Sequence, residues 1–233
     1  MANRATDVLR KWIGVWALPQ HCVLCMEPGA SLCEPCREDL PGLRAERCPV
    51  CAHQSVRAEI CGQCLAHPPR YAKVSAAVSY SFPIDAVIRR LKYAADLALI
   101  EPLASLLTRR VADEMRPDCI VPMPLSAQRL RERGFNQSLE IGRAVAARLE
   151  IPLFRAACRR IRHTAPQAGL PLDQRQANIR GAFACDTQVN AMRVAVIDDV
   201  ITSGATLNEV ARVLLKAGAV EVRGWVVART ERA

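Results

Sequence analysis

Four pairs of cysteines constrain this chain more than any other feature of its sequence. Each pair has the spacing Cys-x-x-Cys, and gaps of 7, 11 and 9 residues separate consecutive pairs. A Cys-x-x-Cys turn places two thiolates on one metal ion, and two such turns complete a tetrahedral four-thiolate site. The pairs therefore predict two structural zinc ions, with the ligands Cys22, Cys25, Cys33, Cys36, Cys48, Cys51, Cys61 and Cys64.

The spacing leaves two questions about these cysteines open. Consecutive pairs can form two successive ribbons, or alternate pairs can interleave in a cross-braced unit, and the short gaps favour the ribbons. Disulfide bonds and an iron–sulfur cluster are alternatives to zinc, but disulfide bonds belong to oxidising compartments. Because so short a region buries little core, we expect metal binding to supply most of its folding free energy.

The length of 233 residues suits one mid-sized domain and a small one. No apolar run reaches the roughly 18 residues that span a membrane, and we find no secretory signal pattern. These observations predict a cytoplasmic protein without a membrane span. The expected parts are an amphipathic helix within residues 1–20, a double zinc-ribbon module over residues 21–67 and a larger domain over residues 71–233.

Positive charge is concentrated in the larger domain. The formal net charge of the chain is +9, of which residues 71–233 carry +8. Residues 120–180 contain 11 arginines, no lysine and 4 acidic residues. Such a cluster suits phosphate, pyrophosphate or nucleic acid, although an ordinary solvated basic surface has the same composition.

Strands alternate with helices along the larger domain. Hydrophobic patterns predict strands at residues 74–80, 119–121, 193–197 and 220–228, and helices at residues 84–93, 101–115, 136–149 and 206–217. This alternation predicts an α/β fold with a mostly parallel sheet and helices on its faces.

The segment between residues 194 and 206 carries the most chemical information. An apolar strand is followed by Asp198 and Asp199, and then by a turn rich in hydroxyl groups and glycine that leads into a helix. The N–H groups of a helix N-terminus bind phosphate, and carboxylates accept hydrogen bonds from sugar hydroxyls. The segment therefore predicts a ribose-5-phosphate site, although a helix cap beside a surface acid would also give two adjacent aspartates.

This segment resembles the motif with which type I phosphoribosyltransferases bind 5-phosphoribosyl-1-pyrophosphate (PRPP). The resemblance implies the parallel-sheet fold of that family, and it implies that Asp198 and Asp199 contact the ribose hydroxyls of PRPP. It also implies a Mg²⁺ ion, bound mainly by oxygens of PRPP. The residues that would hold the 5-phosphate are Thr202, Ser203, Gly204, Ala205 and Thr206.

Further motifs narrow the family. They are Leu91-Lys92-Tyr93, Val121-Pro122-Met123-Pro124-Leu125, Arg133-Gly134-Phe135-Asn136-Gln137-Ser138 and Thr164-Ala165-Pro166-Gln167. Together with the cysteine array they resemble the ComF/GntX proteins over nearly the whole chain. A guanidinium can hold phosphate oxygens with two hydrogen bonds, so the arginines after residue 125 are candidates for binding pyrophosphate. These arginines are Arg129, Arg131 and Arg133.

Two functions fit these features. The first is an enzyme that transfers the phosphoribosyl group of PRPP to a nitrogen acceptor and expels pyrophosphate, although no acceptor or general base can be assigned. The second follows from the resemblance to ComF. It is a cytoplasmic protein that handles single-stranded DNA during natural transformation, with PRPP as an effector or a vestigial ligand. The nearly neutral zinc module favours a protein partner.

Overall fold

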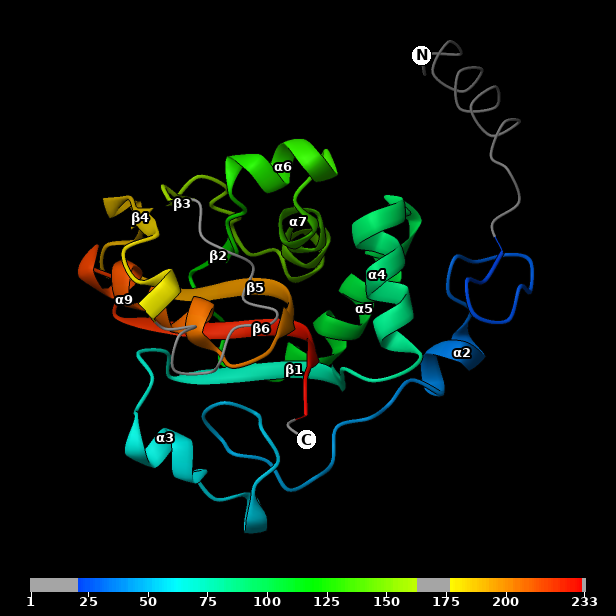
Figure 1. Cartoon of the computed structure of the whole chain (residues 1–233), viewed down its shortest axis with the longest axis horizontal. Helices are drawn as coiled ribbons and strands as arrows, with labels where there is room; N and C mark the ends of the chain where they lie inside the picture. The colour runs from blue at the N-terminus through cyan, green and yellow to red at the C-terminus, as the bar shows by residue number, and fades with distance from the viewer. Residues whose placement is uncertain (1–20, 163–176, 232–233) are drawn as a thin grey trace, which may run out of the picture. The chain divides into compact units, whose positions relative to one another are not determined.

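The computed structural model describes residues 21–162 and 177–231 of the chain (Figure 1). The helix expected within residues 1–20 and the motif at residues 164–167 lie outside the described residues. The chain divides into two compact units, one up to Leu40 and one from Pro41 onward. The third and fourth Cys-x-x-Cys turns are therefore part of the larger unit.

The smaller unit is built around the first two Cys-x-x-Cys turns. The first turn is closed by a hydrogen bond of 2.8 Å from the backbone N–H of Cys22 to the carbonyl oxygen of Glu27. Helix α2 (Glu34–Glu38) follows, with Pro35 in its first turn, where a missing N–H costs nothing. Within residues 21–40, few apolar side chains are buried, so we expect the stability of this segment to depend on metal.

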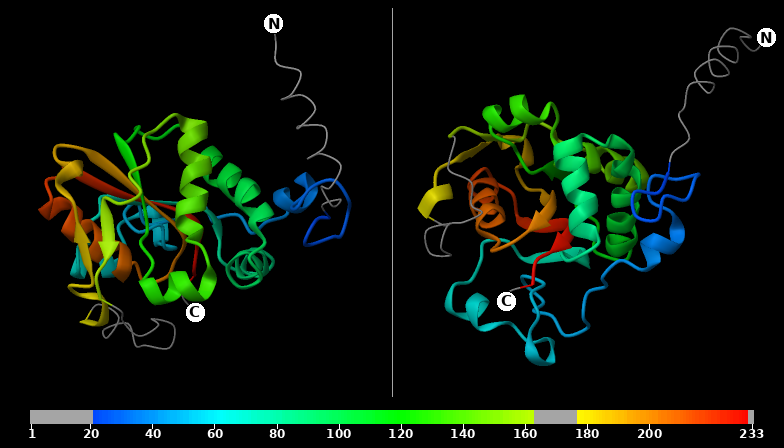
Figure 2. Two further views of the ribbon diagram at one scale, coloured as in Figure 1. Left: turned by 90° about the horizontal axis from the view of Figure 1, so that it is seen from above. Right: turned by 45° about the vertical axis from the view of Figure 1, so that its right-hand side comes forward.

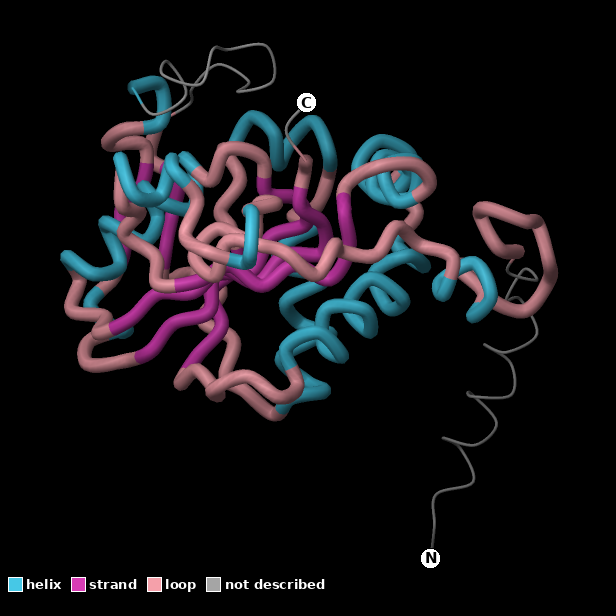
Figure 3. The backbone as a smooth tube through the Cα atoms, turned by 90° about the horizontal axis from the view of Figure 1, so that it is seen from below, coloured by secondary structure: helices cyan, strands magenta, loops and turns pink. Residues whose placement is uncertain are grey.

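A four-stranded parallel sheet with the strand order β1-β6-β5-β2 forms the centre of the larger unit. The magenta strands of Figure 3 include this sheet. The two central strands, β5 and β6, are largely buried, which explains why their sequences are almost continuously apolar. The strands are β1 (Lys73–Ser79), β2 (Cys119–Pro122), β5 (Arg193–Ile201) and β6 (Glu221–Arg229).

Helices cover both faces of this sheet (Figure 2). Helices α5 (Ile100–Val111) and α7 (Gln137–Leu149) pack on one face, where Gly142 lets α7 approach Ile197 closely. Helix α9 (Ala205–Lys216) packs on the other face, where Leu207 fills the space that a side chain at Gly224 would need. Ile197 pairs in register with Trp225, the neighbour of Gly224, so these two contacts lie on opposite faces.

The other elements surround this core. Helix α4 (Ile84–Ala94) follows β1, and α6 (Ala127–Arg133) lies between β2 and α7. An antiparallel pair, β3 (Cys158–Arg160) and β4 (Phe183–Cys185), lies beside α9. The short helices are η1 (Val56–Ala58), α3 (Gly62–Ala66), η2 (Leu97–Leu99) and η3 (Thr187–Val189).

The predicted α/β fold, with a parallel sheet and helices on both of its faces, is confirmed. Strand β5 continues to Ile201 instead of ending at residue 197, because the segment that contains both aspartates still pairs with β6. The helix predicted to reach residue 115 ends at Val111. Among the described helices, none is long and apolar enough to cross a membrane.

Candidate functional site

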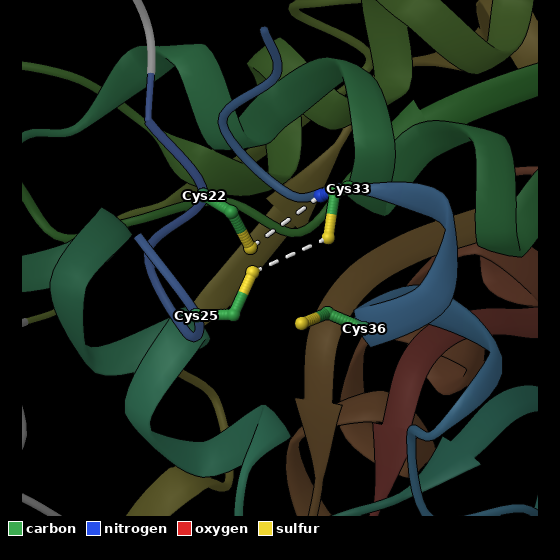
Figure 4. Close-up of side chains that lie close together, drawn as sticks. All are labelled: Cys22, Cys25, Cys33 and Cys36. Carbon is green, nitrogen blue, oxygen red and sulfur yellow. Dashed lines mark hydrogen bonds between the residues drawn. The ribbon is translucent and has the colours of Figure 1, made fainter. Parts of the chain in front are cut away.

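The first four cysteines form one cluster (Figure 4). Their sulfur atoms all lie within 4.8 Å of one another, and the sulfurs of Cys25 and Cys33 are 3.6 Å apart. A tetrahedral zinc ion with Zn–S bonds of about 2.3 Å separates its sulfur ligands by roughly 3.8 Å. The spacing of the four sulfurs therefore fits zinc.

The second cluster has the same geometry and lies in the larger unit. It consists of Cys48, Cys51, Cys61 and Cys64, and the sulfurs of Cys51 and Cys61 are 3.7 Å apart. Consecutive Cys-x-x-Cys turns thus pair as two successive ribbons. Because each site has four thiolate ligands and is complete, the zinc in both is structural.

At one cysteine of each cluster, backbone N–H groups favour the thiolate form that zinc requires. The N–H of Cys33 donates to the sulfur of Cys22 over 3.5 Å, and the N–H of Cys61 donates to the sulfur of Cys48 over 3.4 Å. Burial opposes ionisation, but these and neighbouring backbone donors outweigh it. They lower the pKa of Cys22 to about 6 and the pKa of Cys48 to about 7.

A pocket lies where β5 ends and α9 begins, at the carboxyl edge of the sheet. Of the seven residues predicted to bind PRPP, five line it: Asp198, Thr202, Gly204, Ala205 and Thr206. Ser203 instead lines a second pocket, on the side of the second cysteine cluster. Asp199 is buried, with 3% of its surface exposed, and lines neither pocket.

Gly204 shapes the loop at the start of α9. Its φ of +79° lies in the left-handed region that favours glycine, and its carbonyl oxygen accepts the first helical hydrogen bond, from Asn208. The first N–H groups of a helix lack partners within the helix, and they give this end a positive partial charge. The loop therefore presents to the pocket a helix end that suits a phosphate group.

The two aspartates have different surroundings. The hydroxyl of Ser138 donates to Asp198 over 2.8 Å, and so does the backbone N–H of Asp199 over 2.9 Å. Asp199 forms an ion pair with Lys92, whose side chain is only 19% exposed, and accepts a hydrogen bond of 3.3 Å from Gln137. Asp198 thus faces the pocket, while Asp199 is held by Lys92 and Gln137.

These surroundings move the two carboxyl pKa values in opposite directions. Burial, together with the neighbouring charge of Asp199, raises the pKa of Asp198 to about 8. Burial alone would also raise the pKa of Asp199, but the charge of Lys92 and its hydrogen bond hold that pKa below its usual value. The pair therefore prefers to carry one negative charge near neutral pH.

Arg133 joins the same network from α6. It donates to the side-chain oxygen of Gln137, and its guanidinium lies 5.9 Å from the centre of the Tyr93 ring. Lys92 and Tyr93 come from α4, and Gln137 and its neighbour Ser138 come from α7. Two motifs that are far apart in the sequence, residues 91–93 and residues 133–138, therefore meet at the aspartate pair.

The three candidate arginines of α6 do not share one location. Arg133 belongs to the aspartate network, whereas Arg129 lies near β3, where burial and the charges of Arg129 and Arg162 lower the pKa of Arg160. Arg160 also lies over the ring of Phe183, 5.6 Å from its centre. Arg131 is exposed on the surface of α6.

Sequence reasoning did not assign Lys92, Gln137 and Ser138 to the site, although all three lie within the motifs that indicate the family. A signal existed for Lys92. The buried stripe of α4 is Ile84, Val87, Ile88 and Leu91, and Lys92 lies at the edge of that stripe, where a charge needs a partner. For Gln137 no such signal exists, because nothing in the local sequence of α7 identifies Asp199 as its neighbour.

Comparisons with known proteins agree with these features. The model of the double zinc ribbon domain family matches residues 14–65. Competence protein F of Haemophilus influenzae is 33% identical to the chain over 211 residues, which cover 85% of this chain and 90% of that protein. The chain belongs to the ComF/GntX family. DNA utilization protein YhgH of Salmonella typhimurium is 32% identical to the chain, over 91% of this chain and 98% of that protein.

Competence protein ComFC of Bacillus subtilis is also related to this ComF-family protein, with 28% identity over 83% of this chain and 81% of that protein. Solved structures similar to part of the chain include an allosteric regulatory enzyme of purine biosynthesis, with 22% identity, and a glutamine PRPP amidotransferase from B. subtilis, with 20% identity. The TM-scores are 0.37 and 0.38, over 55% and 54% of this chain, and the match spans only a quarter of each of those chains.

Proposed function

We propose that this ComF-family protein binds PRPP with Mg²⁺ at the carboxyl edge of its sheet. One observation carries the proposal: Asp198 and the N-terminus of α9 face the same pocket. A carboxyl group there accepts hydrogen bonds from ribose hydroxyls, and the helix end receives the 5-phosphate. Asp199 supports this arrangement from behind, because it holds Lys92 beside the ribose position.

Mg²⁺ fits this pocket because it prefers oxygen ligands, which PRPP and the threonine hydroxyls of the loop offer. When bound, Mg²⁺ would offset the negative charge of the pyrophosphate. Arg133, which donates to Gln137, the neighbour of Asp199 in this network, would hold the pyrophosphate oxygens. The same geometry supports transfer of the phosphoribosyl group to a nitrogen acceptor, since pyrophosphate leaves more readily when its charge is stabilised.

Thermal stabilisation by parts of PRPP tests this proposal. We expect Mg²⁺ with PRPP to raise the melting temperature most, ribose-5-phosphate to raise it less, and pyrophosphate to raise it least. Asp198→Asn should lose the response to PRPP and ribose-5-phosphate. Asp113→Asn is the control and should keep the response. It changes an exposed acid at the opposite end of the sheet, since its neighbour Glu114 pairs with Lys73 at the start of β1. Equal responses to all three compounds, or none, would contradict the proposal.

A second candidate function is the handling of single-stranded DNA. It is favoured by the cluster of Arg129, Arg160 and Arg162, because several neighbouring guanidinium groups suit the phosphates of a single strand. Several relatives are named for competence or DNA utilization. PRPP would then be an effector or a vestigial ligand.

Salt dependence separates this candidate from non-specific binding. Binding of a labelled single strand should weaken steeply as salt increases, and Arg160→Ala should reduce both the affinity and the slope. Arg193→Ala, at the amino end of β5, is the matched control because it removes an exposed arginine elsewhere. Binding that ignores salt, or that falls equally in both variants, would exclude the cluster as the DNA site.

We infer a cytoplasmic location, since two four-thiolate zinc sites persist in a reducing compartment. The nearly neutral charge of residues 1–70 makes the zinc ribbon a candidate surface for a protein partner rather than for DNA.

A further inference from the structure

Arg229 connects the second cysteine cluster with the phosphate loop. This last residue of β6 is almost fully buried, with 2% of its surface exposed. Its Nε donates over 3.0 Å to the carbonyl oxygen of Cys51, one of the zinc ligands. Its Nη1 donates to the carbonyl oxygens of Ile201, over 3.2 Å, and of Thr202. One guanidinium therefore spans the metal site and the first residue of the loop.

Tyr71 forms a second contact between the same two regions. It follows the last cysteine of the cluster, and its side chain is 5% exposed. A Cβ atom at Gly204 would lie 2.8 Å from the Tyr71 hydroxyl, so the ring rests directly against the loop. Next to it, the backbone N–H of Arg70 donates to the side chain of Asn208 in α9 over 2.6 Å.

The cluster and the loop also share a core and a pocket. Cys48, Cys51 and Cys64 are buried in the same apolar cluster as Ile201 and Ala205. The second pocket is bounded by both regions: Cys51, Cys64 and Tyr71 line it from the side of the cluster, and Ser203, Gly204 and Ala205 line it from the side of the loop. The second metal site therefore underlies the phosphate loop on the side away from the proposed PRPP pocket.

We expect the structure of residues 41–70, which carry these contacts, to depend on bound metal. Between Pro41 and Arg70 the structure has only η1 and α3, of three and five residues, and helices this short are not stable by themselves. The backbone N–H of Val74 in β1 donates to Val50 over 2.8 Å, next to Cys51. Loss of metal would let Cys51 move, and a buried Arg229 would lose one of its acceptors, which is costly.

We propose that the second four-cysteine site is part of the phosphate site, so that zinc at this site fixes the loop at residues 202–206 and sets its affinity for a phosphate ester. The loop part of this proposal stands on the contacts of Arg229 and Tyr71, and the affinity part rests on the proposed function. Arg229 is a positioning residue that acts through the carbonyl oxygens it holds. Because coupling between two sites is reciprocal, a phosphate ester in the pocket should also raise the affinity of this site for zinc.

Amide hydrogen exchange of the loop tests the proposal in the full chain, with zinc content measured in parallel. Cys61→Ser should remove one zinc ion and speed exchange of the loop amides at least about tenfold, the effect of losing one buried hydrogen bond. Cys25→Ser is the matched control in the smaller unit. It should also remove one zinc ion, and it should leave the loop unchanged. Unchanged loop exchange in Cys61→Ser after loss of zinc would overturn the proposal.

Arg229→Lys covers the case in which Cys61→Ser does not fold. It keeps both zinc sites and a positive charge, but lysine cannot reach the carbonyl oxygens on both sides, so the loop should again exchange faster. Loop exchange equal to the wild type would overturn the proposal. Titration with PRPP separates the two claims: wild-type protein that does not bind PRPP refutes the proposed function and leaves the exchange result standing. Equal PRPP affinity in wild type and Arg229→Lys refutes the coupling instead.

Discussion

Lys92 of α4 forms an ion pair with Asp199 of β5, and both side chains are largely shielded from water. The pair does not line the pocket of the proposed PRPP site, but it holds the residue next to Asp198 in place, because Asp199 also accepts a hydrogen bond from Gln137. Burial would lower the pKa of Lys92, but the charge of Asp199 raises it above its usual value, so the pair stays charged near neutral pH.

Lys92→Met should leave the buried charge of Asp199 without its partner and cost about 3 kcal/mol of stability at neutral pH. The pKa of Asp199 is lowered in the folded protein, so its stabilising effect is present above the usual aspartate pKa and is lost as the pH falls through the folded value. The destabilisation should therefore shrink in acid. Denaturant unfolding at several pH values measures it. Lys92→Met/Asp199→Asn is the control and should recover much of the loss; no recovery would show that the ion pair is not the cause.

Asp198→Asn should stabilise the protein at alkaline pH while it weakens ligand binding. In the folded protein the pKa of Asp198 is raised from 3.8 to about 8. Protonated Asp198 therefore stabilises the fold, with its whole effect present below the unfolded pKa, and this stabilisation is lost as the pH rises through about 8. Asparagine does not titrate. As the pH rises from roughly 5 to 9, the free energy of unfolding of the variant should rise by about 1–3 kcal/mol relative to that of the wild type. This is less than full burial would give, because solvent screens the site. A difference that does not change with pH in thermal unfolding would contradict the raised pKa.

Gly204→Ala should destabilise the protein by about 2 kcal/mol and weaken binding of phosphate esters. Alanine disfavours the left-handed φ of +79°, and its Cβ would press against the Tyr71 hydroxyl. Gly134→Ala is a matched control, because Gly134 also has a left-handed φ, of +82°, but no atom lies within 4 Å of a Cβ there. The difference between the two variants in denaturant unfolding isolates the Tyr71 contact. Equal losses would mean that the contact contributes nothing.

Purified protein should contain two zinc ions per chain, and Cys25→Ser and Cys61→Ser should each contain one. Each site needs four thiolates, so loss of one ligand should empty that site and leave the other filled. Metal analysis with a chromophoric chelator measures this. A chain that loses both ions when only one site is changed would show that the two ribbons do not bind zinc independently.

Local sequence predicted those features that depend on local spacing. The Cys-x-x-Cys turns predicted both metal clusters, because each turn places two thiolates a fixed distance apart. The alternation of apolar strands and amphipathic helices predicted the parallel sheet, and the acidic strand end with its hydroxyl-rich turn predicted the pocket at α9. The pairing of consecutive turns became clear only from the structure, because the gap lengths allow both arrangements.

Features that depend on contacts between distant segments were not predictable. Lys92 and Asp199 meet only because α4 packs beside the carboxyl edge of the sheet. Arg229 looks like a surface residue at a strand end, yet it is buried because a cysteine turn covers it. Strand β5 runs past its apolar stretch because pairing with β6 outweighs the preference of two aspartates for a turn. In each case the partner is distant in sequence, and local propensity carries no information about it.

Calorimetric titration of PRPP with Mg²⁺ into the full chain tests the central claim most directly. We expect saturable binding of one PRPP per chain, which is lost in Asp198→Asn and kept in Asp113→Asn. Absence of binding to the wild-type protein, or binding that survives in Asp198→Asn, would contradict the assignment of the pocket between Asp198 and α9 as the PRPP site.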